Sequence, residues 1–152
     1  MNPEIRLLTY DDALPLQSLV EAGSAEVSQY GPTIGSGTIY PLLIQAILGG
    51  QALFCAEADG SLVGYCGWVS MPSGPEGTVY GTGTFVEKEH RGRGLAREMR
   101  ERAIEHWRRL GFSQVIGTAA AGNQAGLDSA KAAGFFVSGH EMRFDLRGSD
   151  GE

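Results

Sequence analysis

The feature that most constrains the fold is a loop of glycine and arginine between an expected strand and an expected helix. Residues 82–86 form a strand-like run, and residues 90–94 read His-Arg-Gly-Arg-Gly. A strongly periodic helix is expected over residues 95–110. A strand, a glycine-rich turn and a helix in this order predict an α/β arrangement with an anion site at the helix N-terminus.

The loop has the chemistry of a phosphate site. Gly92 and Gly94 lack the side chains that would keep a ligand away from the backbone. The first N–H groups of the following helix have no partner inside the helix, and they carry a partial positive charge. With Arg91 and Arg93 beside them, these groups predict binding of a phosphate or pyrophosphate.

Spacing excludes two common phosphate motifs. A P-loop requires G-x-x-x-x-G-K-[ST], and no Lys-Ser or Lys-Thr follows a glycine pair. A dinucleotide fingerprint requires G-x-G-x-x-G, but residues 81–86 end on Val and precede the loop. What remains is Arg91-x-x-Gly94-x-Ala96, which resembles the acyl-CoA signature [QR]-x-x-G-x-[GA] of the GCN5-related N-acetyltransferase (GNAT) family.

A second stretch carries the same resemblance. Residues 123–135 read N-Q-A-G-L-D-S-A-K-A-A-G-F and are similar to the family's second motif, in which an Asn opens a helix that ends in Gly-Phe. The resemblance covers residues 4–146. It implies an α/β (α+β) fold with a mixed, mostly antiparallel central sheet of about six to seven strands flanked by about four helices.

The resemblance also implies a co-substrate and the residues that hold it. Acetyl-CoA is the expected acyl donor, with its pyrophosphate on the Arg-Gly loop and its pantetheine arm along the strand over residues 78–86. Backbone N–H groups near Phe85 and Val86 are expected to polarise the thioester carbonyl. The expected cofactor-binding residues are Phe85, Val86, Arg91, Gly92, Arg93, Gly94, Leu95, Ala96 and Asn123.

The usual catalytic groups of the family are absent. Where many members carry a Tyr that protonates the leaving thiolate, this chain has Ala130, and where many carry a Glu as base, it has Tyr80. Tyr80 is the candidate catalytic residue, able to donate a hydrogen bond or orient a water; lining the pocket is the alternative role. Ser129 and His140 are weaker substitutes for the missing groups.

The acceptor pocket is expected to include a stretch of small and polar residues, 24–36, although a plain surface loop explains the same pattern. The candidate substrate contacts are Glu26, Gln29, Tyr30 and Thr82. A carboxylate that attracts a cationic amine is also expected, and the spacing does not choose among Glu26, Glu57 and Glu87.

Periodicity predicts the other elements. Helices are expected over residues 12–23 and 40–48. Strands are expected over residues 4–8, 52–58, 62–71, 78–86, 112–121, 135–138 and 141–146, with an Asp59-Gly60 hairpin turn. Gly81 and Gly83 suggest a bulge. The period of two predicts one shared face for Thr78, Tyr80, Thr82, Thr84 and Val86.

Composition is that of an ordinary globular chain, with 152 residues, 42% hydrophobic and 20% charged. One domain over residues 1–146 and a loose tail over 147–152 are expected. No apolar run approaches the about 20 residues of a spanning helix, and no signal-peptide pattern opens the chain. A cytoplasmic protein without a membrane partner is therefore expected.

Cysteine, histidine and charge patterns narrow the class further. Cys55 and Cys66 are expected to be buried and reduced, and the spacing of the histidines predicts no metal site. The net charge of −6 argues against nucleic acid. The arginines over residues 91–109 alternate with glutamates, giving the i,i+4 pairs Glu98/Arg102 and Glu105/Arg109 of a solvated helix face.

These features predict an acyl-CoA-dependent N-acyltransferase (EC 2.3.1 type) that transfers acetyl from acetyl-CoA directly to an amine of a small molecule. The alternative is a GNAT-fold module that binds acyl-CoA with little catalysis, as a sensor or scaffold. A nucleotide-binding α/β domain outside the family is the third reading. The resemblance also implies a homodimer through the last strands, where Phe135, Phe136 and Phe144 suit either a dimer contact or a core.

Overall fold

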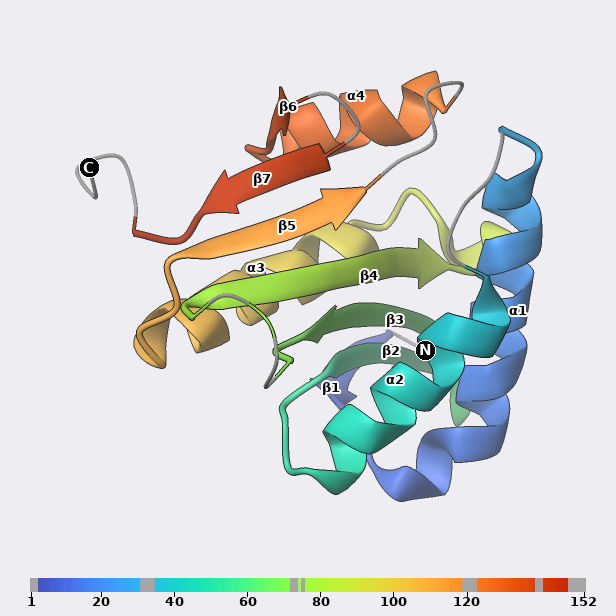
Figure 1. Ribbon diagram of the computed structural model, residues 1–152. Coiled ribbons are helices and arrows are strands. Elements are labelled where there is room, and N and C mark those ends of the chain that lie inside the picture. The colour runs from blue at the N-terminus through green and yellow to red at the C-terminus, as the bar shows by residue number, and fades with distance from the viewer. Residues whose placement is uncertain are drawn as a thin grey trace.

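A seven-stranded sheet organises the part of the chain that the computed structural model describes, residues 3–30, 35–71, 74, 76–118, 123–138 and 141–147 (Figure 1). The strands are β1 (Glu4–Leu7), β2 (Phe54–Ala58), β3 (Ser61–Val69), β4 (Thr78–Val86), β5 (Gln114–Thr118), β6 (Phe136–Ser138) and β7 (Glu141–Asp145). The helices are α1 (Ala13–Ser28), α2 (Ser36–Leu48), α3 (Leu95–Arg109) and α4 (Gln124–Ala132), with short 3-10 turns η1 (Tyr10–Asp12) and η2 (Lys88–His90).

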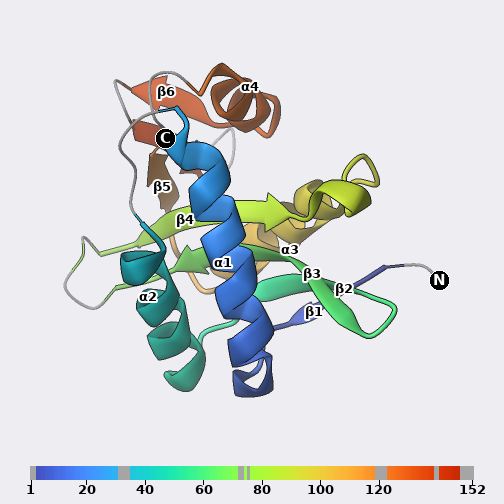
Figure 2. The same ribbon diagram turned by 90° about the vertical axis from the view of Figure 1, so that its right-hand side faces the viewer.

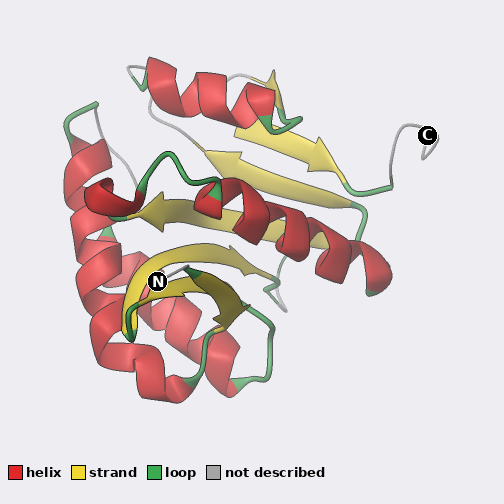
Figure 3. Ribbon diagram, turned by 180° about the vertical axis from the view of Figure 1, so that it is seen from behind, coloured by secondary structure: helices red, strands yellow, loops and turns green. Residues whose placement is uncertain are grey.

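The strand order is β1-β2-β3-β4-β5-β7-β6, and every neighbouring pair is antiparallel except β4 and β5. Helices α1 and α2 cover one face of the sheet (Figure 2), and α3 lies across the other (Figure 3). The expected mixed, mostly antiparallel sheet with four flanking helices is confirmed.

Each face of the sheet has its own apolar core. The α3-side core contains Leu95, Met99, Ala103 and Trp107, the four-and-three spacing expected of the helix. The α1/α2-side core includes Leu16 and Leu43, both fully buried. The sequence also placed Leu110 on the α3 stripe; this was wrong, since Leu110 caps the helix end and is 59% exposed.

Strand β4 leaves its neighbour β5 half-way along. The parallel pairing runs only from Thr78 opposite Gln114 to Gly81 opposite Gly117, whereas β4 continues to Val86. Backbone groups on that edge of β4 beyond Gly81 have no partner on β5. The sheet is therefore open between β4 and β5 at the end where β4 runs toward α3.

A bulge in β4 occurs at the same place. Cys66 and Trp68 of β3 face Thr84 and Gly81 of β4, so three steps on β4 match two on β3. Gly83 has a φ of 136°, which favours glycine. The bulge expected from the two glycines is confirmed.

The bulge overturns the prediction of one shared face along β4. Tyr80 packs against the α1/α2-side core, but Val86 belongs to the α3-side core, and the Thr84 hydroxyl lies 3.6 Å from the Cys66 sulfur in that core. The extra residue reverses the alternation between the two halves of the strand. Thr84 and Val86 therefore point away from the face that Tyr80 uses.

The early helices are longer than the sequence predicted. Helix α1 continues to Ser28, so residues 24–28 are helical rather than loop, and α2 begins at Ser36 instead of residue 40. Residues 31–34 of the expected loop lie outside the described residues. Glu26 therefore projects from the last turns of a helix rather than from an irregular loop.

A charged cluster fastens β1 to the start of α1 and to β2. The Arg6 guanidinium donates to both carboxylate oxygens of Asp12 at 2.9 Å, and its Nε donates to Glu57 at 2.7 Å. Asp12 in turn accepts from the Thr9 N–H at 2.8 Å, as in a capping box. Glu57, one candidate for attracting an amine, is thus paired with Arg6 at the sheet edge.

No helix in the described ranges is long and apolar enough to cross a membrane.

Candidate functional site

The Arg-Gly loop presents uncapped N–H groups at the start of α3. Gly92 and Gly94 have φ values of 83° and 78°, which let the backbone turn sharply into the helix. The first intrahelical bond runs from the Glu98 N–H to the Gly94 carbonyl, so the N–H groups of Leu95 and Ala96 precede the helix ladder. No side chain of the N-cap, Gly94, occupies them. These are the donors that an anion requires.

The Arg91 side chain is held in place by contacts with β4 and α1. Its Nε donates to the Val86 carbonyl at 2.7 Å, and its Nη2 donates to the Glu26 carboxylate at 3.0 and 3.1 Å. The guanidinium carbon lies 5.4 Å from the centre of the Phe85 ring. Arg91 therefore joins the loop to the end of β4 and to α1, while Arg93 is exposed to solvent.

The candidate acceptor residues fall at the C-terminal end of α1 and on β4. Glu26 is paired with Arg91, the Gln29 amide donates to the Glu26 carbonyl, and Tyr30 is 37% exposed just after the helix. The Thr82 hydroxyl donates to the Gly67 carbonyl at 2.6 Å. Two of the predicted acceptor contacts, Glu26 and Thr82, therefore already have hydrogen-bond partners within the protein.

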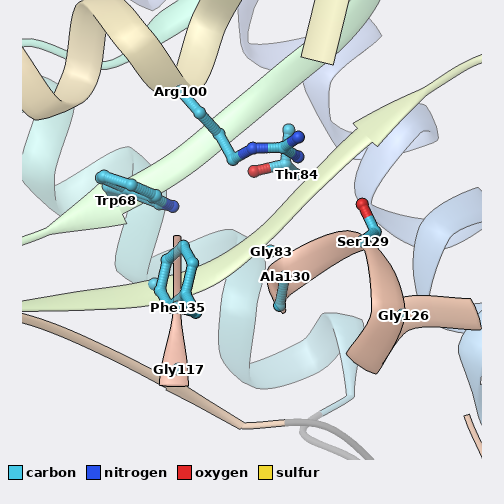
Figure 4. A pocket seen from close by; sticks show the side chains of 10 residues that line it. Trp68, Gly83, Thr84, Arg100, Gly117, Gly126, Ser129, Ala130 and Phe135 are labelled. Carbon is cyan, nitrogen blue, oxygen red and sulfur yellow. The ribbon is translucent and has the colours of Figure 1, made fainter. Parts of the chain in front are cut away.

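A pocket of about 190 Å³ opens where β4 leaves β5 (Figure 4). It lies between β4, α3 and α4, and its walls include both sides of the opening, Gly81 and Gly117. This volume is below the range of about 300–1,000 Å³ that holds a drug-sized ligand, so it suits one end of a ligand. The pocket is lined by Trp68, Gly81, Gly83, Thr84, Arg100, Gly117, Gly126, Ser129, Ala130 and Phe135.

The second motif reaches this pocket through α4. Asn123 is the N-cap of α4, and its Oδ1 accepts from the Gly126 N–H at 2.9 Å, which confirms the helix start expected from the sequence. Ser129 and Ala130, the position of the missing Tyr, both line the pocket. His140, the other suggested substitute, lies outside the described residues.

Tyr80 does not line this pocket. Its side chain packs against the α1/α2-side core, close to Gly74 in the loop between β3 and β4. Arg100 and Ser129 reach the pocket from α3 and α4, on the opposite face of the sheet. The structure thus separates the candidate catalytic tyrosine from the pocket by the thickness of β4.

Two buried titratable groups lie close to the opening and are neutral. Burial raises the pKa of the Cys66 thiol to about 12, against a smaller opposing effect of the Thr84 hydroxyl. Burial also raises the pKa of Tyr65 to about 12. Cys55 is likewise buried with a raised pKa, so both cysteines are free thiols in apolar surroundings, as expected.

One group of ligand atoms was not anticipated. Among the described residues, side-chain atoms of Glu87, Glu89 and His90 lie within 4.8 Å of one another. All three residues are at least partly exposed, and acidic groups often cluster at surfaces without binding an ion.

Arg100 is the charged pocket residue that the sequence analysis did not identify. The arginines of α3 were predicted to form a solvated face, and the pairs Glu98/Arg102 and Glu105/Arg109 confirm this for two of them. Arg100 instead stands four residues after Ala96 and four before Ile104, which both pack against the α3-side core. An arginine at a helix position whose i−4 and i+4 neighbours face the core was therefore the sequence signal that Arg100 points inward.

The fold and the opening beside an uncapped helix N-terminus define the class of protein. The sequence model of the Acetyltransferase (GNAT) family matches residues 26–135. The chain therefore belongs to the GNAT family. No curated protein sequence matches it.

Solved structures share the whole fold. The PaiA N-acetyltransferase of Thermoplasma acidophilum, in complex with coenzyme A, matches with a TM-score of 0.78 at 15% identity, over 95% of this chain and 99% of its own. The phosphinothricin acetyltransferase of Sinorhizobium meliloti, in complex with acetyl-CoA, gives 0.78 at 16%, over 98% and 91%. A ribosomal-protein-alanine N-acetyltransferase from Brucella melitensis gives 0.75 at 20%, over 93% and 99%. These TM-scores show a common fold.

Proposed function

We propose that this protein is an acyl-CoA-dependent N-acyltransferase that transfers acetyl from acetyl-CoA directly to an amine. One observation carries the proposal: an uncapped helix N-terminus behind a glycine loop adjoins a strand edge that opens into a pocket. A ligand with phosphates at one end and a long, neutral, amide-containing arm matches these features in order. The coenzyme A and acetyl-CoA bound to structures of the same fold support this choice.

The phosphates bind at the loop. The backbone of Gly92, Gly94, Leu95 and Ala96 supplies N–H donors, and Arg93 adds positive charge. Arg91 contributes after exchanging its exposed contact with Glu26, or by holding the loop on Val86.

The arm of the cofactor lies along the open edge of β4. Amides of pantetheine pair with backbone groups near Phe85 and Val86, which have no partner on β5. The thioester end then enters the pocket, whose α4 wall is positioned by the Asn123 cap. Backbone N–H groups of β4 polarise the carbonyl as its oxygen gains negative charge.

The acceptor is an amine of a small molecule, approaching from the α1/α2 face. Glu26, Tyr30 and Thr82 lie at this side of β4 and at the end of α1. Tyr80, half-buried on the same face, orients the amine or a water that removes its proton. Most of the acceleration then comes from holding two reactants in line.

One observation favours a second function, a GNAT-fold module that binds acyl-CoA without turnover. Ala130 stands in the pocket where many relatives carry a Tyr, and no carboxylate lines the pocket in the described part of the chain. Turnover with amines separates the two functions, because both require cofactor binding.

The decisive experiment is calorimetric titration with acetyl-CoA, beside CoA, ADP and NAD, on the wild type and on Arg91→Glu. Micromolar binding of acetyl-CoA that the substitution weakens strongly is expected. A screen of amines with thiol release as the readout then tests catalysis. Absence of acetyl-CoA binding, or equal binding by the variant, contradicts the acyltransferase proposal.

A further inference from the structure

We infer that Arg100 binds the thiolate that leaves when acyl transfer breaks the C–S bond of acyl-CoA. This inference rests on the proposed function, and it assigns the leaving-group role to a residue of α3 instead of α4. The starting observation is a cation in the pocket without a counter-charge.

Arg100 reaches into the pocket from the second turn of α3 (Figure 4). Its Nε is shielded from solvent and has no hydrogen-bond partner. No hydrogen bond or ion pair joins Arg100 to another residue in the described ranges. In this respect it differs from Arg91, Arg102 and Arg109, which each pair with a glutamate.

The surroundings of Arg100 are neutral. The other described residues that line the pocket are glycines, Trp68, Phe135, Ala130, and the hydroxyl residues Thr84 and Ser129. A guanidinium loses hydration in such a place and regains little from these neighbours. The pocket therefore favours an anion beside Arg100.

The location of Arg100 matches the reactive end of the cofactor. It is five residues beyond the start of α3, about 7–8 Å further along the helix axis than the phosphate-binding N–H groups. The pocket also contains Ala130, where a thiol-protonating Tyr is expected from the family resemblance. A cation thus faces the pocket from which that acid is missing.

The arm of acetyl-CoA is neutral before the reaction, so negative charge arises here only as the reaction proceeds. The amine nitrogen forms a bond to the carbonyl carbon, and the C–S bond then breaks with its electron pair on sulfur. The proton lost by nitrogen goes to water, and the thiolate takes a proton from water after transfer. A fixed guanidinium stabilises this sulfur anion more than the thioester, which is the requirement for catalysis.

The other titratable groups near the pocket are neutral. The Cys66 thiol is neutral, because burial raises its pKa to about 12, and Tyr65 on the opposite face is neutral for the same reason. Arg100 is the one charged residue among the described pocket walls. Titration of a bound thiol therefore reports on Arg100.

The test measures the pKa of the thiol of bound CoA by thiolate absorbance, with dethio-CoA as the blank. A cation in contact lowers a thiol pKa by one unit or more. We expect this shift in the wild type, its loss in Arg100→Met, and partial retention in Arg100→Lys. With a reactive amine, Arg100→Met lowers kcat about tenfold to a hundredfold, while the acetyl-CoA Kd changes less than about threefold.

The matched control is Arg109→Met, which removes an exposed arginine from the other end of α3 and keeps the wild-type thiol pKa. Equal thiol pKa values in the wild type and Arg100→Met, with both proteins folded by circular dichroism, overturn the inference. A wild-type preference for succinyl-CoA over acetyl-CoA that Arg100→Met abolishes also overturns the inference, because Arg100 would then bind the carboxylate of the acyl group. If the wild type binds neither CoA nor acetyl-CoA, the proposed function fails as well, and this outcome is distinct from binding without a shift.

Discussion

The Nη2 of Arg91 donates to both carboxylate oxygens of Glu26, at 3.0 and 3.1 Å, and joins the phosphate-binding loop to the last turns of α1. Each side chain of this pair is 40% exposed, so the contact is weak and exchanges readily. Glu26 therefore competes with a phosphate for Arg91. The pair places a carboxylate beside the site proposed for a polyanion.

Removing that carboxylate is expected to tighten cofactor binding. Glu26→Gln keeps the size of the side chain and removes one negative charge, so acetyl-CoA affinity rises about two- to threefold at low salt and less at high salt. Arg91→Met removes the cation and the bond to Val86, and weakens binding about tenfold. Calorimetric titration at two salt concentrations measures both effects. If both substitutions weaken acetyl-CoA binding equally, the ion pair acts by holding the loop in its conformation.

The left-handed backbone at Gly94 is expected to matter for binding beyond its effect on stability. Gly94→Ala places a Cβ at a φ of 78°, which destabilises the fold by about 1–2 kcal/mol and displaces the N–H groups of α3. Gly60→Ala is the matched control, because Gly60 has a φ of 79° in the distant hairpin turn. The melting temperature should fall by a similar amount in both variants. The affinity for acetyl-CoA should fall at least about tenfold, and only in Gly94→Ala. Similar cofactor affinity in both would show that the loop does not bind the phosphates.

The hydroxyl of Tyr80 is expected to act on the acceptor rather than on the cofactor. Tyr80→Phe leaves the ring in the α1/α2-side core and removes only the hydroxyl, so kcat falls about tenfold or more and the acetyl-CoA Kd is unchanged. Tyr10→Phe, at a residue 57% exposed on η1, serves as the control. Steady-state kinetics with saturating amine make the comparison. An unchanged kcat in Tyr80→Phe would leave the tyrosine with only a packing role on the α1/α2 face.

The Arg6–Asp12 pair is expected to make stability depend on pH in acid. Hydrogen bonds from Arg6 hold the pKa of Asp12 below its ordinary value of 3.8. The stability from this pair is therefore complete above about pH 4 and is lost as the pH falls through the lower, folded-state pKa. Arg6→Met should lower the free energy of unfolding by about 1.5–3 kcal/mol at pH 7, and by less below pH 4.

Urea denaturation of the wild type and Arg6→Met at pH 7 and at about pH 3 measures this difference. Arg109→Met breaks an exposed pair and should change stability by less than about 0.5 kcal/mol at either pH. A destabilisation by Arg6→Met that stays constant down to pH 3 would assign the effect to lost packing of the arginine.

The two cysteines are expected to be silent in thiol assays of the native protein. Cys55 and Cys66 are buried, and burial raises the pKa of each to about 12, so neither forms the reactive thiolate near neutral pH. A disulfide reagent should detect both thiols in urea and neither in buffer. Reaction of either thiol in native protein would reveal opening of the sheet.

Local patterns predicted the elements whose own residues determine them. The bounds of β4, the Asn123 cap and the Asp59-Gly60 turn each depend on adjacent residues, and each is confirmed. The C-terminal half of α1 packs against a distant part of the chain, because Gly23 lies against the ring of Phe85 on β4. Small, polar residues with low helix propensity gave no sign of this continuation.

The site could be predicted only where its chemistry belongs to the backbone. The Arg-Gly loop and α3 start where the motif placed them, since glycine and helix periodicity encode the geometry directly. The pocket depends on a bulge that shifts β4 by one residue, and on α3 and α4 lining the opening from parts of the chain that are distant in sequence. The glycines of β4 signalled a bulge but not which side chains it would turn over.

The bulge between Gly81 and Thr84 determines which face of the sheet each later residue of β4 points to. The even-numbered residue Tyr80, before the bulge, lies on the α1/α2 face, whereas the even-numbered Thr84 and Val86, after it, lie on the face where Arg100 lies. If the same residues alternated regularly without the bulge, Thr84 would turn away from the pocket and Val86 out of its core. Separation of the proposed acceptor side from the proposed leaving-group side therefore depends on the bulge, and substitutions that preserve the bulge leave this separation intact.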